Sequence, residues 1–278
     1  MVTPKPPNPV ESSSDFKIGR YSIVRHIAQG GMGAVYQVED PETGEMFAMK
    51  LTSPETHART QLEHIHRALS SFDHPGVLKS HRCGETDDGR AYMILDFVGG
   101  CPAQVFAKSM GLPGTPKRTT AVITVAIHVA EALDYLHQNQ IIHRDIKSAN
   151  VMVREDHTAC IIDFDSVVMA HTPHKSGHFI GTYTYAPPEQ IRGLPVNGQA
   201  DVYALGVLLY RMLSGKRPFE AETTEALINM HLTETPAPLR KIVTDVPSSV
   251  ARIVAQMLEK ESHGRPSARV IADRLRRA

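Results

Sequence analysis

The sequence predicts an α+β fold with two parts: a small antiparallel sheet with one main helix, and a larger, mainly helical part. From Tyr21 to about Leu95 the chain consists of short β-rich runs separated by Gly, Pro and Asp turns. After the Val-Gly-Gly at 98–100, long apolar patterns with helical spacing replace them. The absence of a sequence repeat with a period of roughly 20 to 50 residues argues against a solenoid or a propeller.

Periodicity and turn residues predict the elements of both parts. The helix of the first part has Ser53 as N-cap and Pro54 at its first helical position, and the Asp-His-Pro-Gly at 73–76 ends it. Further helices are expected at 120–139 and 201–213, with shorter ones between about 223 and 276. The expected strands are RYSIVRHIAQ, GAVYQVED, MFAMKLT and AYMILDFV, and the apolar face of the first helix comprises Leu62, Ile65, Ala68, Leu69 and Phe72.

Charge and composition argue against several classes of function. Among 278 residues, 30 Lys and Arg balance 30 Asp and Glu, so no overall field favours nucleic acid or an anionic membrane as partner. The most apolar stretches, AVITVAIHVAEAL and DVYALGVLLYRML, are too short and too interrupted to span a bilayer. Cys83, Cys101 and Cys160 lack metal-binding or redox spacing and predict reduced thiols. We therefore expect a cytoplasmic protein without a membrane segment.

The first 20 residues differ in composition from the rest of the chain. They are rich in Pro and Ser and lack the basic-then-apolar order of a signal peptide. We expect residues 1–20 to form a disordered tail.

A glycine-rich stretch, IAQGGMGAV at 27–35, joins two expected strands. Glycines allow a tight hairpin whose backbone amides can approach a phosphate closely, although such hairpins are also common without a ligand. The stretch lies between strands, so it is neither a Walker loop nor a dinucleotide-binding fingerprint. Lys50 ends the next apolar run and is either a solvated strand-end lysine or a partner for phosphate.

Two further stretches carry groups that suit chemistry. IIHRDIKSANV at 141–151 places His, Arg, Asp, Lys and Asn in a fixed order directly after a helix and before a β-rich run. CIIDFDSV at 160–167 ends an apolar run with two aspartates. Taken alone, the second stretch fits an acidic turn at a strand end as well as a metal ligand.

Together these stretches resemble the protein kinase family, whose signature is a Gly-rich loop, a strand lysine, an H-R-D loop ending in Asn, a D-F-G and an A-P-E. All five occur here in that order, and GGMGAVY resembles the bacterial, Hanks-type serine/threonine kinases. The resemblance implies a two-lobed kinase domain at 21–276, with a small lobe at 21–95, a hinge at 96–100 and a large lobe at 101–276. It also implies ATP and Mg²⁺ as cofactors and Ser/Thr hydroxyls of proteins as acceptors.

The resemblance also implies residue roles. Asp145 would be the base that accepts the hydroxyl proton, Lys147 marks the Ser/Thr class, Lys50 would pair the α and β phosphates, and Asn150 and Asp163 would hold magnesium. Thr182 matches the threonine that contacts the catalytic loop. Residues expected to bind the nucleotide are Ile27, Ala28, Gln29, Gly30, Gly31, Met32, Gly33, Ala34, Val35, Ala48, Lys50, Leu95 as gatekeeper, Asp96, Val98 and Met152.

Three departures from the family pattern support an alternative, a pseudokinase that binds nucleotide or a partner without efficient transfer. Ala28 stands where the first loop glycine is usual, and Asp165 replaces the glycine of D-F-G. In the first helix, Ile65 occupies the register of the glutamate that pairs with the strand lysine. Glu63 is two residues earlier, about 200° around the helix, so the usual Lys–Glu pair is expected to be absent or distorted. A third reading, a small-molecule phosphotransferase, is disfavoured by GTYTYAPPE, which docks protein substrates in the family.

The segment between Asp163 and Glu189 suggests regulation. Arg144 precedes the catalytic aspartate, and in kinases such an arginine can pair with a phosphate on this segment. Thr172 and Ser176 are the nearest candidate acceptors for autophosphorylation; the alternative is that they are simply polar loop residues. His171, His174 and His178 are better explained as loop residues than as zinc ligands. Glu189 with Arg265 is expected to brace the large lobe, and Asp201 to cap a helix and support the catalytic loop.

Overall fold

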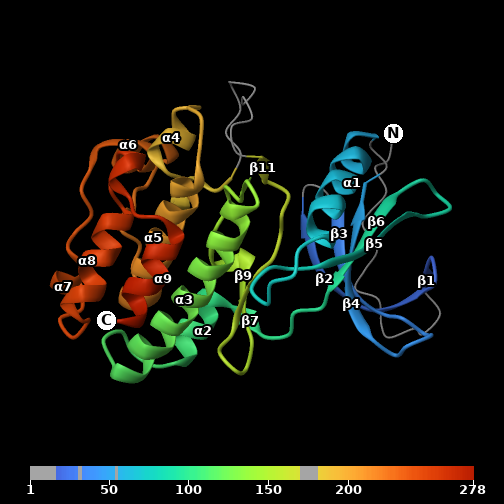
Figure 1. The fold of residues 1–278 in the computed structure, drawn as a ribbon, viewed down its shortest axis with the longest axis horizontal. Helices are drawn as coiled ribbons and strands as arrows, with labels where there is room; N and C mark the ends of the chain where they lie inside the picture. Colours follow the sequence, from blue (N-terminus) through green and yellow to red (C-terminus); the bar gives the residue numbers. More distant parts are fainter. Residues whose placement is uncertain (1–16, 31–32, 54–55, 170–180) are drawn as a thin grey trace. The chain divides into compact units, whose positions relative to one another are not determined.

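The computed structural model describes residues 17–30, 33–53, 56–169 and 181–278. The chain forms two compact units (Figure 1). Unit 1 contains residues up to Asp73 together with Leu78–Val98, and unit 2 contains His74–Val77 and Gly99–Ala278. The segment at 74–77 belongs to unit 2 because Val77 bridges Ile161 and the Ile161 amide donates to the Gly76 carbonyl at 2.8 Å. This differs from the expected lobe at 21–95, which contained that segment.

Unit 1 is one antiparallel sheet of six strands with one helix. The strand order is β1-β2-β3-β4-β6-β5. The helix α1 contacts β5 and β6. The elements are β1 (Lys17–Ile18), β2 (Tyr21–Gly30), β3 (Gly33–Glu39), β4 (Met46–Thr52), α1 (Thr56–Ser70), β5 (Ser80–Glu85) and β6 (Ala91–Asp96).

Two of these strands differ from the expectation. Residues 17–20, assigned above to the tail, form β1 and a turn, because Ile18 pairs with Tyr21 and both side chains are buried in the core of the unit. Residues 1–16 of the expected tail lie outside the described part of the chain. The strand β5 was missed because its sequence, SHRCGE, is polar and its side chains are mostly exposed. It forms because β6 supplies an antiparallel partner.

Unit 2 is mainly helical, which confirms the predicted fold class. Its core lies where α3 packs against α5 and α9, and α5 is buried along almost its whole length (Figure 1). The elements are β7 (Cys101–Pro102), α2 (Ala103–Ser109), α3 (Pro116–Gln138), β8 (Ile141–Ile142), η1 (Ser148–Asn150), β9 (Val151–Val153), β10 (Ala159–Ile161), β11 (Val168–Met169), η2 (Tyr183–Tyr185), α4 (Pro188–Ile191), α5 (Gly198–Ser214), α6 (Thr224–Thr233), α7 (Leu239–Ile242), α8 (Ser248–Met257), η3 (Ser262–Gly264) and α9 (Ala268–Arg276).

The helix α3 is longer than expected, with 23 residues. Within the described ranges it is the one helix that is long and apolar enough to cross a membrane by length and composition. In the structure more than half of that apolar stretch is buried inside unit 2. Its apolar character is therefore accounted for by packing against neighbouring helices.

Candidate functional site

The H-R-D stretch forms a loop between β8 and η1 of unit 2, and this loop holds Asp145 at the centre of a polar cluster. Lys147 Nζ donates to Asp145 Oδ2 at 2.6 Å, and the Thr182 hydroxyl donates to Asp145 Oδ1 at 3.0 Å. Lys147 Nζ also donates to Thr182 Oγ1 at 3.1 Å. The Asp145 side chain is only 8% exposed. The contact of Thr182 with this loop was predicted and is confirmed.

Asn150 completes the cluster from the end of η1. Its side-chain amide donates to the Asp145 carbonyl at 2.9 Å and to Asp145 Oδ2 at 3.0 Å. Because the amide nitrogen is engaged in this way, the side-chain oxygen is left as the acceptor of Asn150. The same loop geometry therefore orients both the carboxylate of residue 145 and the amide oxygen of residue 150.

Asp201, in the first turn of α5, supports this loop by hydrogen bonds to its backbone. It is fully buried, and its carboxylate accepts the amides of His143 at 2.9 Å and Arg144 at 2.8 Å. His137 Nε2 lies 2.8 Å from the same carboxylate. Burial alone would raise the pKa of Asp201, but the hydrogen bonds and charges of His137 and His143 hold it below its usual value. The expected support of the catalytic loop is confirmed, whereas the N-cap of α5 is Asn197, whose side chain accepts the Gln199 amide at 3.1 Å.

The Asp-Phe-Asp stretch at 163–165 begins two residues after the end of β10. Asp163 has φ +64°, in the left-handed backbone region that residues other than glycine rarely adopt. Phe164 is buried, and its ring meets the edge of His143 at 5.1 Å between centroids. Burial lowers the pKa of the fully enclosed His143. Asp165 does not have a positive φ. This position therefore does not need the conformational freedom of glycine, and an aspartate fits there.

The segment after residue 180 is fixed to the catalytic loop by its own contacts. Gly181 has φ +124°, and a Cβ there would lie 2.8 Å from Gln190 Nε2 and 3.1 Å from the Arg144 carbonyl. Gln190 Nε2 donates to that same carbonyl at 3.0 Å. The glycine is therefore required for this close approach. Arg211 of α5 donates to the Tyr185 hydroxyl at 2.9 Å and holds the end of the segment.

Glu189 and Arg265 form the predicted buried ion pair. The guanidinium donates to both carboxylate oxygens, at 2.7 and 2.9 Å, and its side chain is 0% exposed. Arg265 also donates to the carbonyls of Gln199, Glu259 and Lys260. This pair joins the segment at 181–189 to the C-terminal part of unit 2 and confirms the structural role expected for it.

In unit 1 the sheet register places several of the residues expected to contact nucleotide on one face. Val35 pairs with Ala28 on one side and with Lys50 on the other, and Ala48 pairs with Leu95. Directly paired residues and residues two apart on a strand share a face. Ala28, Val35, Lys50, Ala48 and Leu95 therefore lie on the same face.

The other residues that were predicted to bind nucleotide do not all lie on this face. Gln29 and Ala34 pair with each other on the alternate face, and Ile27 lies at an irregularity between His26 and Ala28. Gly33 has φ +139°, and a Cβ there would approach the Leu51 carbonyl oxygen to 2.0 Å, so this glycine is required. Gly30 pairs with Gly33, Asp96 ends β6, Val98 ends unit 1, and Met152 lies on β9 of unit 2.

The helix α1 continues without a break from Thr56 to Ser70 and includes both Glu63 and Ile65. Ile65 is buried, as the periodicity predicts, together with Leu62, Leu69 and Phe72, while Ala68 is half-buried. Glu63 is 45% exposed and pairs with Arg59 at 3.0 Å, and Arg59 reaches Glu85 on β5 at 2.5 Å. Within the described part of unit 1, the ion pair of Glu63 is thus made along its own helix.

Some expected residues fall outside the described part of the chain. These are Gly31 and Met32 of the glycine-rich hairpin, Pro54 of the first helix, and Thr172, Ser176, His171, His174 and His178. Two residues that hold the catalytic loop were not predicted, His137 and Gln190. Each lies on a helix without local sign of its role, because the partner is 64 positions away for His137 and 46 for Gln190.

The donor set of unit 2 suits a hard divalent cation. The carboxylate of Asp163 and the amide oxygen of Asn150 are the oxygen ligands that Mg²⁺ prefers, and Mg²⁺ usually keeps several waters and binds substrate phosphates besides one or two protein groups. In the described ranges no group of three or more His, Cys, Asp or Glu is arranged to hold a metal by itself. A cation here would therefore be shared with a phosphate-bearing substrate.

The structure thus brings Lys147, Thr182 and Asn150 together around the buried carboxylate of Asp145. The protein kinase domain family matches residues 21–274, and the chain belongs to the protein kinase family. The predicted resemblance is confirmed. Members of this family use ATP as phosphoryl donor together with a divalent metal ion.

The chain is similar to bacterial serine/threonine-protein kinases. It is 31% identical over 251 residues to PknD of Mycobacterium tuberculosis, 31% over 255 to the DNA damage-responsive kinase RqkA of Deinococcus radiodurans, and 32% over 262 to Pkn1 of Myxococcus xanthus. These alignments cover 88%, 89% and 90% of this chain. They cover only 37%, 38% and 36% of the relatives, so the chain spans little more than a third of their length.

Proposed function

We propose that this chain transfers the γ-phosphate of ATP to serine and threonine hydroxyls of proteins. The observation that carries the proposal is the cluster around Asp145, where Lys147, Thr182 and Asn150 all donate to one buried carboxylate. Phosphoryl transfer needs positioning and charge stabilisation more than covalent work by the protein. A carboxylate that is fixed by three hydrogen-bond donors provides the positioning.

Asp145 acts as the base. The acceptor hydroxyl oxygen forms a bond to the γ-phosphorus, the bond from that phosphorus to the β–γ bridging oxygen breaks, and the hydroxyl proton passes to the Asp145 carboxylate. Lys147, held 2.6 Å from Asp145 Oδ2, supplies positive charge next to the incoming phosphoryl oxygens. Thr182 links this pair to the segment that docks protein substrates in the family.

Asn150 and Asp163 would hold the metal ion, for which we propose Mg²⁺. When bound, such an ion would neutralise negative charge on the phosphates of the nucleotide. The Asn150 amide nitrogen donates to Asp145, which leaves the side-chain oxygen of Asn150 as the candidate ligand.

In unit 1, Lys50 pairs the α and β phosphates, and the backbone of the hairpin at 30–33 covers them. Val35, Ala48 and Leu95, on the same sheet face as Lys50, would contact the adenine. The backbone of Asp96 and Val98 supplies hydrogen bonds to the base.

The direct test is incubation of the purified chain with radiolabelled ATP, Mg²⁺ and a generic protein substrate. Asp145→Asn keeps the shape of the side chain but removes the base, so transfer should fall by at least about 10²–10⁴-fold. Asp134→Asn, a half-buried aspartate on α3 that hydrogen-bonds Gln138 and not the Asp145 cluster, is the matched control and should retain full activity. Equal rates in the Asp145→Asn variant and the unchanged chain would overturn the assignment, whereas lack of transfer by both, with ATP still bound, would favour the pseudokinase.

Autophosphorylation and location in the cell belong to the same proposal. We propose Thr172 or Ser176 as acceptors in a cytoplasmic enzyme. Mass spectrometry after incubation with ATP checks the acceptors, and an active enzyme without phosphate between residues 163 and 189 would exclude them.

A further inference from the structure

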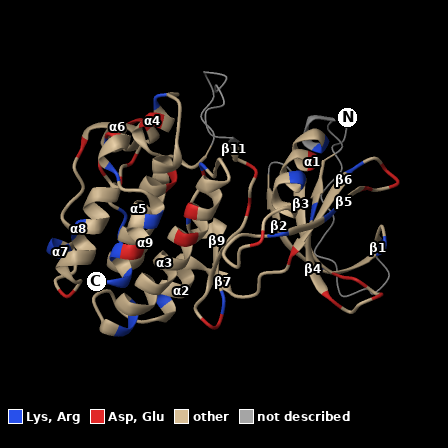
Figure 2. Ribbon diagram, viewed as in Figure 1, with Lys and Arg blue, Asp and Glu red and all other residues tan. Residues whose placement is uncertain are grey.

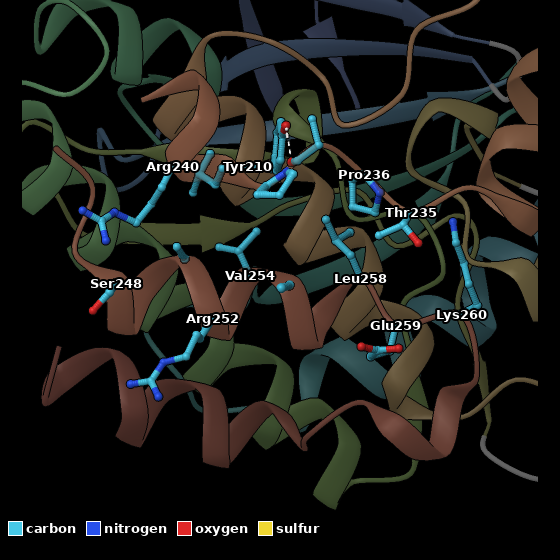
Figure 3. A pocket seen from close by; sticks show the side chains of 15 residues that line it. Tyr210, Thr235, Pro236, Arg240, Ser248, Arg252, Val254, Leu258, Glu259 and Lys260 are labelled. Atoms are coloured by element: carbon cyan, nitrogen blue, oxygen red, sulfur yellow. Dashed lines mark hydrogen bonds between the residues drawn. The ribbon is translucent and has the colours of Figure 1, made fainter. Parts of the chain in front are cut away.

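A groove in unit 2 is lined by residues that take no part in the cluster around Asp145. It has a volume of about 440 Å³ and is lined by α8, by Tyr210 of α5 and by the stretch at 235–240 that joins α6 to α7 (Figure 3). A volume of this size falls in the range of roughly 300–1,000 Å³ that is typical of ligand-binding pockets. It is large enough to receive more than one side chain of a partner.

The base of the groove is apolar and its wall is preformed. Leu239, Val254 and Leu258 are buried and line it. The Tyr210 hydroxyl donates to the Ala237 carbonyl at 2.9 Å, which fixes the wall formed by the stretch at 235–240. Because the wall is already held by the protein's own hydrogen bonds, a partner would bind without the cost of ordering it.

The small residues along the groove leave room for side chains. Ala251 and Ala255 stand one helical turn apart on α8, and Ala237 and Pro238 are exposed on the opposite wall. Pro236 and Pro238 have no backbone N–H, so this wall cannot extend a β-ladder with an added strand. Recognition therefore has to come from side chains that enter the groove.

Positive charge gathers at one end of the groove. Figure 3 shows Arg240, Ser248 and Arg252 at one end and Thr235, Glu259 and Lys260 at the other. Arg252 is the one charged residue of α8, it is exposed, and in the described ranges no hydrogen bond or ion pair engages it. Among the residues that the structure describes, Arg240 donates only to the Thr244 carbonyl, at 3.3 and 3.4 Å, and the adjacent Lys241 adds further positive charge on α7 (Figure 2).

The charges at the opposite end are already engaged or cancel. Lys260 donates to the carbonyls of Met230 and His231 at 3.1 and 2.8 Å, where it stabilises the C-terminal end of α6. It also lies 4.3 Å from the centre of the Phe219 ring. The Glu259 carboxylate next to it leaves this end near neutral, so the groove has a positive end and an apolar middle.

We propose that this groove docks an acidic and apolar peptide segment of a protein partner, with carboxylates at Arg240 and Arg252 and a bulky apolar side chain over Val254 and Leu258. The arginines match carboxylates in charge and in their forked hydrogen-bonding geometry. The segment binds whether or not the chain transfers phosphate. The docking surface is thus separate from the function proposed above.

The test uses three labelled peptides and the full chain without ATP. The probe is fluorescein-labelled Asp-Glu-Asp-Gly-Leu-Leu-Phe; in the second peptide the acids are replaced by Lys, and in the third the three apolar residues are replaced by Ser. Fluorescence anisotropy should show binding of the first peptide only. Because the pairs are charged and near the surface, its affinity should fall as salt is raised.

Two variants with matched controls locate the binding. Arg252→Glu should lower the affinity for the acidic probe at least about tenfold and raise the affinity for the Lys peptide, because the charge at the end of the groove is reversed. Arg269→Glu makes the same change at an exposed position of α9 outside the groove and should have no more than a small effect. Ala255→Trp should block the probe by filling the groove, whereas Gln256→Trp, on the neighbouring exposed position of α8, should not.

The outcomes separate the alternatives. Thermal unfolding first establishes that each variant is folded. The proposal is overturned if the acidic probe does not bind at millimolar concentration, or if Arg252→Glu and Arg269→Glu change its affinity equally. It is also overturned if the Lys peptide binds as well as the acidic one, or if vesicles of anionic lipid bind through Arg252 while the probe does not.

Discussion

The catalytic loop of unit 2 and the helix α1 of unit 1 both carry charged residues at family positions, but they hold them differently. Asp145 and Asp201 are buried, and each accepts at least three hydrogen bonds. Glu63 of α1 is 45% exposed and shares Arg59 with Glu85. Buried charge networks lose much when one partner is removed, whereas exposed pairs contribute little. The comparison predicts that substitutions in unit 2 will be costly and that Glu63 will be dispensable.

The largest effect is expected at the strand-end aspartates. Asp163→Ala removes the carboxylate that we propose as a metal ligand and should abolish measurable transfer. Asp165→Gly restores the residue usual in the family at a position whose φ does not require it, and should leave transfer measurable. Phosphate incorporation assayed across Mg²⁺ concentrations checks both variants, and an equal loss in the two would contradict the assignment of the metal to Asp163.

A large loss of stability is expected for Glu189→Gln. The variant leaves the guanidinium of Arg265, which is 0% exposed, without its counter-charge. Such losses typically cost about 3–5 kcal/mol in the free energy of unfolding. Urea denaturation measures it, with the exposed Glu261→Gln as control. A change below about 1 kcal/mol would mean that the backbone carbonyls around Arg265 suffice to compensate its charge.

His231 should make stability depend on pH. Burial, and next to it the charge of Lys260, lower the pKa of His231 to about 4. Between about pH 6.5 and 4 the unfolded chain binds this proton and the folded chain does not, so stability should fall as the pH drops through that window. With each pKa unit worth about 1.4 kcal/mol, the contribution reaches roughly 3 kcal/mol.

The matched variants for this effect are His231→Gln and His263→Gln, the second at an exposed position. Urea denaturation at several pH values compares their slopes with that of the unchanged chain. The first variant should be less stable near neutral pH, because it loses the contact with the Tyr203 hydroxyl at 2.9 Å, but it should have a flatter pH dependence. Identical slopes in all three proteins would contradict the role of His231.

The sequence predicted the polar cluster around Asp145 better than it predicted the residues that support it. Asp145, Lys147 and Asn150 lie within six residues and form a recognisable order, and the apolar period of α1 correctly placed Ile65 in the core. His137 and Gln190 were missed because they act through partners far along the chain. The strand β5 was missed because its stability comes from pairing with β6 and not from its own polar sequence.

The smallest effect in the comparison belongs to Glu63, and it provides the most direct test of the account. Phosphate transfer should be measured side by side for the unchanged chain, Glu63→Gln and Lys50→Met, with urea denaturation of each. The account predicts that Lys50→Met removes nearly all activity, while Glu63→Gln keeps most of it and loses less than about 1 kcal/mol of stability, as expected for an exposed pair. If Glu63→Gln removes activity as fully as Lys50→Met, the register assigned to α1 and the separation between buried and exposed charges are both contradicted.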